Sequence, residues 1–573
     1  MILSRPYPWE KSYPAGADWA APVRTGTINE LFDRAVAAFG DNYALEYRDR
    51  RTTYRELSDL VSRAASGLLQ LGVKPGTAVG LYLPNTPVHP ILFFAVLKCG
   101  GRVVHMSPLD AERELAHKLK DSGARIMVTT NFPGMVARAL KLDAEGLLDH
   151  LIVGDDAAFG PAPIPYDAIP ANGRTITLES LLSLGLPPAQ WPEVMEDDIA
   201  LLQYTGGTTG LPKGAMLLHR NLTATNSLYK NWAAAQYELK SGEKVIVCLP
   251  LFHIYALSAV FIRAIDQGNE CLLRPRFDVE TTFRDIEEKK ANYFPGVPTM
   301  WIALTSSPDL EKRDLSSLSM CASGGAPLPV EVFERFKKIT GISLRGGWGM
   351  TETAPAGTNL PYDGDAPAGT IGLPLPGIYM DVVALDEPTR LLPFGETGEI
   401  RIKGPNVFAG YWNKPEETKA AFVEDGHFLT GDIGTMDENG WLFLVDRKKD
   451  MIISGGFNVY PSVIEQALFE HPDIEGVIVI GVPDDYRGEA AKAFIKMRKD
   501  APPLTLDAVR NFLADKVGKH EMPAGIEIRD ALPMTSVGKL SKKELVEEER
   551  QKYQAMKHQN ASAASGHAPT VRK

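Results

Sequence analysis

Cysteine is scarce in this sequence, and the few cysteines form no pattern. The 573 residues contain four, Cys99, Cys248, Cys271 and Cys321, and no two of them form a C-x-x-C pair. The sequence therefore indicates neither a zinc site nor a disulfide framework. A reducing compartment fits this cysteine usage best.

The sequence also has little that predicts export or a membrane span. Its start, MILSRPYPWEKSYPAG, has no apolar stretch behind a basic segment. The longest apolar stretch, 245–265, contains Pro250, His253 and Arg263, which would be costly at the centre of a bilayer. We expect buried core there and a cytoplasmic protein. Peripheral contact with the inner face of the membrane stays open.

An excess of positive charge is missing as well. The net charge is −11, which repels a polyanion at long range, so nucleic acid is not expected as a partner. Hydrophobic residues make up 44% and charged residues 23%, as in ordinary globular proteins. A chain of this length is expected to build several packed subdomains.

The pattern of apolar residues predicts an α/β protein. Strand-like runs at 78–83 and 125–129 alternate with helix-like segments at 54–71 and 88–98. This alternation indicates βαβ units with mainly parallel sheets. From about residue 381 the chain changes to short strands and turns, with a hairpin turn expected at 438–440, and a β-rich subdomain is predicted there.

The segment 204–216, YTGGTTGLPKGAM, has the residue types of a phosphate-binding loop. Glycines let backbone amides approach an anion, threonines add hydroxyl donors and a lysine adds positive charge. It is not a Walker A loop, because Pro212 precedes the lysine and Gly214 follows it. A flexible polar turn is the alternative. The residues concerned are Thr205, Gly206, Gly207, Thr208, Thr209, Gly210 and Lys213.

A second segment, GGWGMTET at 346–353, offers three chemical groups in close succession. The ring of Trp348 can stack on a base, the hydroxyl of Thr351 can contact a phosphate and the carboxylate of Glu352 can bind Mg²⁺. The alternative is a core tryptophan beside an ordinary turn, which would give the same sequence.

These motifs together resemble the acyl-adenylate-forming superfamily, which includes acyl-CoA synthetases, peptide-synthetase adenylation domains and luciferases. The stretch LLQYTGGTTGLPKGAMLLHRNL is most similar to bacterial fatty acyl-CoA ligases, and the likeness runs from about residue 25 to 548. It implies an enzyme that uses ATP, Mg²⁺ and coenzyme A. The acid would first become an acyl-adenylate and then a thioester. Trp348 departs from the family, which usually has tyrosine there.

The resemblance also implies roles for individual residues. The catalytic residues would be Lys539, Lys213, Thr351 and Glu352, with Glu352 also holding the metal. Besides the loop at 205–210, further residues would contact the nucleotide and coenzyme A. They are Gly325, Ala326, Pro327, Trp348, Gly349, Met350, Asp432, Arg447, Lys449, Gly455, Gly456 and Phe457. The acid pocket would include His253, Tyr255, Gly296 and Gly324.

Several of these residues have ordinary alternatives. Asp432 resembles the family aspartate that binds the ribose, but an aspartate in a surface turn would give the same sequence. Arg447 resembles the partner of that aspartate, but an arginine in a solvated charge run is the alternative. Lys449 matches the hinge position, and Gly455 and Gly456 the loop along the pantetheine tunnel. Lys539 could be a solvated lysine, SGGAP at 323–327 a common turn, and His253 a core histidine.

By the resemblance the fold has a large N-terminal domain of α/β subdomains plus the β-rich subdomain, and a smaller, mobile α+β domain at the C-terminus. We expect an ATP- and acid-binding domain at 1–446, a hinge at 447–450, the mobile domain at 451–549 and a disordered tail at 550–573.

A medium- or long-chain fatty acid is the expected substrate. Leu257 stands where some long-chain synthetases have a gating tryptophan, so a tryptophan-gated tunnel is not expected. The alternatives are a ligase for aromatic, alicyclic or dicarboxylic acids, an enzyme that loads a carrier protein, a luciferase-type oxidation and an inactive acyl-binding protein. Whether the enzyme is a monomer or a homodimer stays open.

Overall fold

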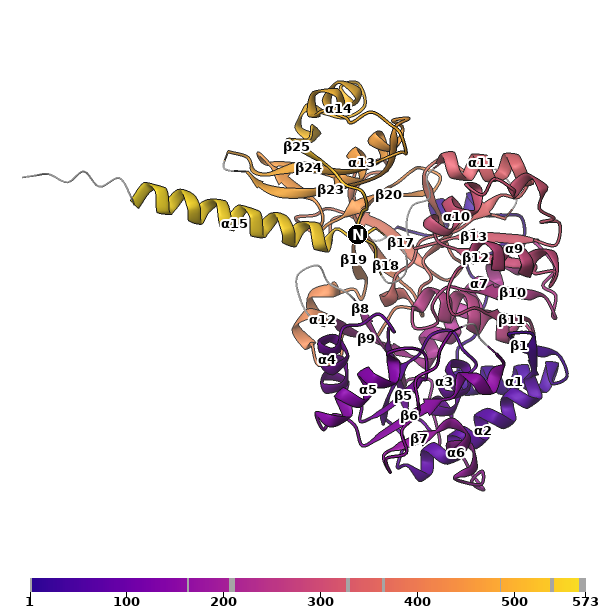
Figure 1. The fold of residues 1–573 in the computed structure, drawn as a ribbon. Helices are drawn as coiled ribbons and strands as arrows, with labels where there is room; N and C mark the ends of the chain where they lie inside the picture. Colours follow the sequence, from indigo (N-terminus) through magenta and orange to yellow (C-terminus); the bar gives the residue numbers. More distant parts are fainter. Residues whose placement is uncertain are drawn as a thin grey trace, which may run out of the picture. The chain divides into compact units, whose positions relative to one another are not determined.

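The computed structural model of the chain describes residues 3–161, 164–205, 212–325, 330–362, 366–484, 486–535 and 540–565. Within it the chain forms two compact units. The first comprises 1–381, 401–429 and 436–442, and the second comprises 382–400, 430–435 and 443–573. Figure 1 shows the elements of both.

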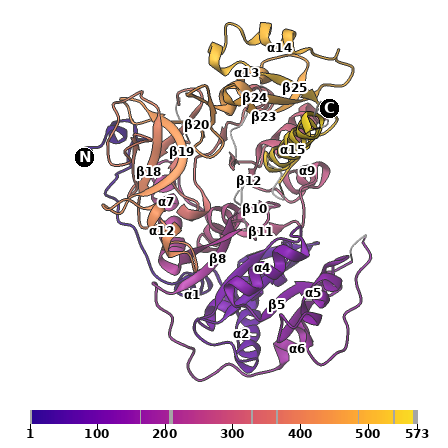
Figure 2. The same ribbon diagram turned by 90° about the vertical axis from the view of Figure 1, so that its left-hand side faces the viewer.

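The first unit contains a seven-stranded sheet with the order β7-β6-β5-β3-β4-β8-β9. Neighbouring strands are parallel except β8 and β9. The strands are β3 (Ala78–Tyr82), β4 (Arg102–Met106), β5 (Ile126–Thr130), β6 (His150–Gly154), β7 (Thr175–Thr177), β8 (Ile199–Thr205) and β9 (Lys213–Leu218). The helices around them are α2 (Tyr54–Gln70), α3 (Val88–Lys98), α4 (Glu112–Ser122), α5 (Met135–Ala144) and α6 (Leu178–Ser183). Figure 2 labels α2, α4, α5 and α6 near β5.

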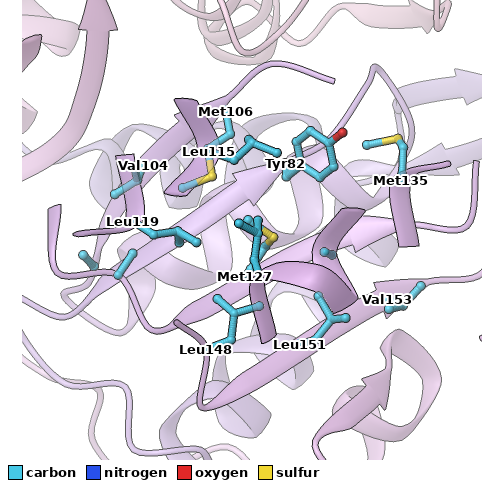
Figure 3. Packing of buried hydrophobic residues seen from close by; sticks show 14 of the residues in the cluster. Tyr82, Val104, Met106, Leu115, Leu119, Met127, Met135, Leu148, Leu151 and Val153 are labelled. Carbon is cyan, nitrogen blue, oxygen red and sulfur yellow. The ribbon is translucent and has the colours of Figure 1, made fainter. Parts of the chain in front are cut away.

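One face of this sheet packs against α4 and α5. Leu115 and Leu119, one turn apart on α4, meet Tyr82 and Met106 from the strands, and all four are at most 2% exposed (Figure 3). Helix α3 is apolar on every side and almost entirely buried, as expected for a helix between packed layers. The helices predicted at 54–71 and 88–98 and the strands predicted at 78–83 and 125–129 agree with the structure to within one residue at each end.

A second seven-stranded sheet has the order β14-β13-β12-β10-β11-β1-β2, and here only β1 and β2 are antiparallel. Its strands are β1 (Tyr43–Tyr47), β2 (Arg50–Thr53), β10 (Lys244–Val247), β11 (Glu270–Leu273), β12 (Tyr293–Gly296), β13 (Met320–Ser323) and β14 (Leu344–Arg345). Helices nearby are α1 (Ile28–Phe39), α7 (His219–Ala234), the π-helix η3 (Tyr255–Ile262), α8 (Arg263–Asp266), α9 (Val279–Glu287), α10 (Pro298–Thr305) and α11 (Val330–Thr340).

The β-rich part is a six-stranded sheet with the order β15-β16-β20-β19-β18-β17. It begins earlier than the predicted residue 381, because β15, β16 and β17 all start before that residue. The strands are β15 (Thr358–Asn359), β16 (Thr370–Pro374), β17 (Tyr379–Val383), β18 (Gly398–Lys403), β19 (Phe428–Met436) and β20 (Leu442–Arg447). The hairpin turn predicted at 438–440 joins β19 and β20. There the Gly440 N–H donates to the Asp437 carbonyl at 3.0 Å, with Gly440 at φ +80°.

The second unit has its own α+β core. Its sheet has the order β22-β21-β24-β23, and β25 pairs in parallel with β24. The elements are β21 (Ile452–Ser454), β22 (Phe457–Val459), α13 (Pro461–Phe469), β23 (Ile474–Asp484), β24 (Gly488–Met497), α14 (Leu506–Leu513) and β25 (Gly525–Ile528). Helices α13 and α14 supply Ile464, Leu468, Val509 and Leu513 to this core. The α/β fold class with a smaller C-terminal domain is confirmed.

The C-terminal segment differs from the expectation of a disordered tail from residue 550. Helix α15 runs over Lys543–Ser565, the long yellow helix of Figure 1. Good helix formers fill this segment, and the pairs Gln551–Glu547 and Lys552–Glu549 link successive turns at 2.9 and 2.7 Å. Composition alone favoured disorder because apolar residues are few there. Residues 566–573 lie outside the described part of the chain.

All four cysteines are buried and free. Burial raises the pKa of the Cys99 and Cys248 thiols to about 12. In the described part of the chain, no helix is both long enough and apolar enough to cross a membrane.

Candidate active site

The two ends of the predicted phosphate loop are the paired ends of strands β8 and β9. Thr205 lies opposite Lys213, and the Thr205 hydroxyl is 3.5 Å from the Lys213 carbonyl. The antiparallel pairing of β8 with β9 thus brings both ends of the loop together. The residues between them, including Gly206, Gly207, Thr208, Thr209 and Gly210, lie outside the described residues.

Strand β9 also pairs with the segment 409–412 on its other edge. Met216 N–H donates to the Gly410 carbonyl at 2.9 Å, and Trp412 N–H donates to the Gly214 carbonyl at 2.8 Å. This short ladder sets Tyr411 beside the first residue of β9, Lys213. The Lys213 ammonium lies 5.1 Å from the centre of the Tyr411 ring and 2.8 Å from a Glu417 carboxylate oxygen.

Tyr411 connects Lys213 to Glu352. Its hydroxyl donates to Oε1 of Glu352 at 2.9 Å, and the Glu352 carbonyl accepts the Phe408 N–H at 2.8 Å. Burial and the nearby Glu352 carboxylate raise the pKa of Tyr411, so the phenol keeps its proton. Glu352 is 6% exposed. A lysine, a tyrosine and a glutamate from three separate segments therefore form one cluster.

The segment around Trp348 is packed so closely that it requires glycine. A Cβ on Gly349 would lie 1.4 Å from the Pro355 carbonyl oxygen, and one on Gly346 would lie 2.2 Å from the Ser323 carbonyl oxygen. Trp348 is 8% exposed, and its ring covers Gly357. Met350 precedes the short 3₁₀ turn η5 (Thr351–Thr353), in which Thr351 is partly buried.

The residues predicted for the acid pocket lie together. The Gly324 N–H donates to the Gly296 carbonyl at 3.1 Å, and a Cβ on Gly324 would lie 2.9 Å from Cζ of Tyr255. His253 lies in the turn before η3, where its Nδ1 accepts the Tyr255 N–H at 3.3 Å. Gly325 is exposed with φ +82°. Ala326 and Pro327 lie outside the described residues.

In the second unit the structure brings Asp432 and Arg447 together. Nε of Arg447 lies 3.3 Å from Oδ1 of Asp432, whose side chain is 4% exposed against 51% for the arginine. The Asp432 N–H donates to the Thr430 hydroxyl at 3.1 Å, which fixes the backbone of β19 at this point. An almost buried carboxylate thus has an arginine that reaches solvent beside it.

The Gly-Gly loop is the turn of the hairpin β21–β22. Gly455 and Gly456 have φ of +58° and +85°, both in the left-handed region, and a Cβ on either would meet open space. Phe457, which follows, is 60% exposed. Lys449 is exposed in the turn after β20. Lys539 lies outside the described residues.

The donor set around Glu352 fits magnesium bound together with ATP. Among the described residues no three acidic, histidine or cysteine side chains gather as a metal site. Magnesium commonly takes one or two protein carboxylates and completes its shell with phosphate oxygens and water. Glu352 can supply that carboxylate, and the Tyr411 hydroxyl holds it in place.

Two residues of this cluster escaped the sequence analysis. Tyr411 and Glu417 lie in and after GYWN, which shows only the pattern of a short strand and a turn. Their closeness to Lys213 depends on the pairing of β9 with 409–412, which joins segments nearly 200 positions apart in the chain. A single sequence read by itself carries no signal for that pairing.

Comparison with known proteins now defines the class. The AMP-binding enzyme family matches residues 32–412, and the C-terminal domain of AMP-binding enzymes matches residues 463–539. The chain belongs to this family of acyl-adenylate-forming proteins. It is an AMP-forming acyl-CoA ligase that uses ATP, Mg²⁺ and coenzyme A.

Individual relatives are similar over nearly the whole chain. A long-chain-fatty-acid–CoA ligase of Bacillus subtilis is 37% identical over 568 residues, covering 95% of this chain and 99% of the relative. A feruloyl-CoA synthase of an Amycolatopsis species is 36% identical over 506 residues, 88% of this chain and 95% of the relative. The crystal structure of ATP-bound MatB from Rhodopseudomonas palustris has a TM-score of 0.80 at 29% identity, covering 91% of this chain and 98% of that one.

Proposed function

We propose that the acid is a medium- or long-chain aliphatic acid. The observation that carries the proposal is the 37% identity to a long-chain-fatty-acid–CoA ligase over 95% of the chain. The turn before η3 and η3 itself support it, because Leu251, Ile254, Ala256 and Leu257 are apolar and buried.

In the first half-reaction the acid carboxylate oxygen attacks the α-phosphorus of ATP. The bond to pyrophosphate breaks, and pyrophosphate leaves with its electron pair. In the second half-reaction the thiol sulfur of coenzyme A attacks the acyl carbon, loses its proton, and AMP leaves. Bringing the reactants together and stabilising charge are the main tasks of the protein.

We assign these tasks to the residues as follows. Lys213 and Thr351 contact phosphate oxygens, and Glu352 supplies a carboxylate to Mg²⁺, which neutralises phosphate charge when bound. Tyr411 orients Glu352, and Glu417 holds Lys213. Lys539 neutralises charge that develops between the carboxylate and the α-phosphate. Asp432 accepts hydrogen bonds from the ribose hydroxyls, with Arg447 beside it.

The experiment is a panel of acids with the purified enzyme, ATP and coenzyme A, followed by AMP release. Each buried methylene contributes about 0.8 kcal/mol, so kcat/KM should rise with chain length until the pocket is full. The panel runs from butanoate to palmitate and includes benzoate and succinate. Higher kcat/KM for benzoate or succinate than for octanoate and palmitate would contradict the proposal.

The same experiment separates the rival activities. A carrier-protein-loading enzyme would form acyl-adenylate without a thioester to free coenzyme A, and a luciferase would need oxygen. Location in the cytoplasm, where thiols stay reduced, agrees with four free cysteines. Membrane contact and oligomeric state stay predictions for sedimentation and vesicle-binding measurements.

A further inference from the structure

Arg263 is a buried cation to which the reaction described above gives no task. It is the first residue of α8, directly after η3, and is only 7% exposed. A guanidinium stays charged at every pH at which proteins work. Burying such a charge is costly unless a carboxylate or other acceptors compensate it.

Tyrosines surround Arg263. Its Nη2 donates to the Tyr237 hydroxyl at 3.2 Å, and its guanidinium carbon lies 5.7 Å from the centre of the Tyr229 ring. The ring of Tyr362 packs edge-on against Tyr237 with centroids 5.2 Å apart. Within the described part of the chain, no carboxylate lies at ion-pair distance from Arg263.

Among the described residues, the side chains in direct contact with Arg263 supply no negative charge. Burial raises the pKa of Tyr229, Tyr237 and Tyr255, so these phenols are neutral at physiological pH. Burial raises the pKa of Glu243, and the charges of Lys240 and Arg263 lower it. This carboxylate lies within electrostatic reach of Arg263, but not at ion-pair distance. Among the described residues, the cation therefore has hydroxyl partners and no carboxylate in direct contact.

Arg263 faces the same side as the acid pocket. It follows Tyr255 by eight residues on the continuous helix η3–α8, which is about two turns when a turn takes about four residues. The Tyr255 ring touches Gly324 of the pocket, and Tyr293 of β12 lies within electrostatic reach of both Tyr255 and Arg263. Tyr229, Tyr255 and Tyr293 are each partly exposed. Tyr255, Tyr293 and Tyr229 thus form a row of neighbouring side chains from Gly324 to Arg263.

We propose that Arg263 binds a second carboxylate at the far end of the acid, so that the preferred substrates are aliphatic acids oxidised at their distal end. A planar guanidinium pairs with a carboxylate through two parallel hydrogen bonds, and Tyr237 holds it in place for that contact. The apolar residues of η3 then accommodate the methylene chain. This inference rests on the proposed function and narrows its substrate class.

Matched pairs of acids test it. Monocarboxylates of six, eight, ten and twelve carbons are compared with the α,ω-dicarboxylates of the same length, by AMP release with coenzyme A. We expect the diacid to have about tenfold higher kcat/KM at the best length, the effect of one charged pair. Arg263→Leu should remove this preference and change kcat/KM for the monoacids by less than about threefold. Arg263→Lys, which keeps the charge, should retain part of it. The exposed Arg276→Leu is the matched control.

The outcomes separate this inference from the proposed function. An unchanged diacid-to-monoacid ratio in Arg263→Leu, or a wild-type preference for the monoacid at every length, overturns the inference and leaves the ligase intact. An equal loss for all acids in Arg263→Leu would place the arginine on the reacting carboxylate and also overturns it. Absence of AMP release with every aliphatic acid contradicts the proposed function instead.

A second variant, Tyr237→Phe, tests the inference if Arg263→Leu does not fold. Tyr237→Phe removes only the hydroxyl that accepts from Arg263, and we expect the preference for the diacid to fall with KM rising and kcat kept. A preference equal to that of the wild type would contradict the role given to the arginine.

Discussion

At the scale of single residues, the contact from Tyr411 to Glu352 can be removed without changing either backbone. Tyr411→Phe deletes the hydroxyl that donates to Oε1 of Glu352 at 2.9 Å. A hydrogen bond to a charged group contributes about 1.5–3 kcal/mol, so adenylation should fall by roughly one to two decades. Because the carboxylate loses its orientation, the Mg²⁺ concentration for half-maximal pyrophosphate exchange should rise.

The partly exposed Tyr43, which is 44% exposed, gives a matched control. Tyr43→Phe should leave both the rate and the Mg²⁺ requirement as in the wild type. If Tyr411→Phe lowers the rate with an unchanged Mg²⁺ requirement, the tyrosine does not act through the metal ligand.

A second prediction at this scale concerns Lys539 in the VGKL turn. Lys539→Ala should suppress adenylation far more than thioester formation from supplied acyl-AMP, since the charge it neutralises develops only in the first step. A contact made chiefly in the transition state can cost several decades at about 1.4 kcal/mol each. The two half-reactions are measured separately, with Lys543→Ala as the control. Equal losses in both would argue against the assigned role.

A residue could be predicted from the sequence where a short motif around it indicates its chemistry. GGWGMTET predicts Gly349 as a nucleotide contact, which stays a prediction. The structure gives a packing reason for glycine, because an added Cβ would lie 1.4 Å from the Pro355 carbonyl oxygen. Tyr411 and Arg263 could not be predicted, because their significance depends on tertiary neighbours. Arg263 entered the sequence analysis only as an argument against a membrane span.

At the scale of elements, His219 joins two helices of the first unit and makes their contact sensitive to pH. It begins α7, and its Nδ1 accepts the N–H of Ile28, the first residue of α1, at 3.1 Å. Burial lowers its pKa from 6.5 to about 4. Above pH 6.5 the imidazole is neutral in both states. Between pH 6.5 and 4 only the unfolded chain takes up the proton, so acid destabilises the fold by up to about 1.4 kcal/mol per pH unit.

His219→Asn should flatten that dependence, because the amide oxygen can accept the same N–H and does not titrate. The expected result is a smaller loss of melting temperature between pH 6.5 and 4.5 than in the wild type, followed by differential scanning fluorimetry. The exposed His520→Asn should keep the wild-type slope. Parallel slopes for His219→Asn and the wild type would contradict this account.

Elements rich in apolar residues were predictable and polar ones were not. The buried helix α3 was predicted at 88–98 and occupies Val88–Lys98. Helix α15 was missed over 550–565, because few apolar residues mark it and its order is supported by helix propensity and pairs such as Lys552–Glu549. The turn at Gly455 and Gly456 was predictable because glycine adopts positive φ readily, and both residues do so here.

At the scale of the whole molecule, one active site must serve two reactions that need different groups beside the same α-phosphate. In the proposed mechanism Lys539 is present for adenylation, and the pantetheine thiol then has to reach the acyl carbon beside the same phosphate. We expect the C-terminal domain to rotate between the two steps, with a few residues absorbing large changes of φ and ψ. The turn after β20 is the place predicted for them, and Lys449 is exposed in it.

Lys449→Pro tests this rotation because it fixes φ at the predicted hinge and also restricts Lys448 before it. Pyrophosphate exchange should stay near normal while acyl-CoA formation falls severely. Lys449→Ala removes the same side chain but leaves the backbone free, so it should retain both activities. Stopped-flow measurement of each half-reaction distinguishes the two variants. Unimpaired thioester synthesis in Lys449→Pro would show that the hinge lies elsewhere or that no such rotation occurs.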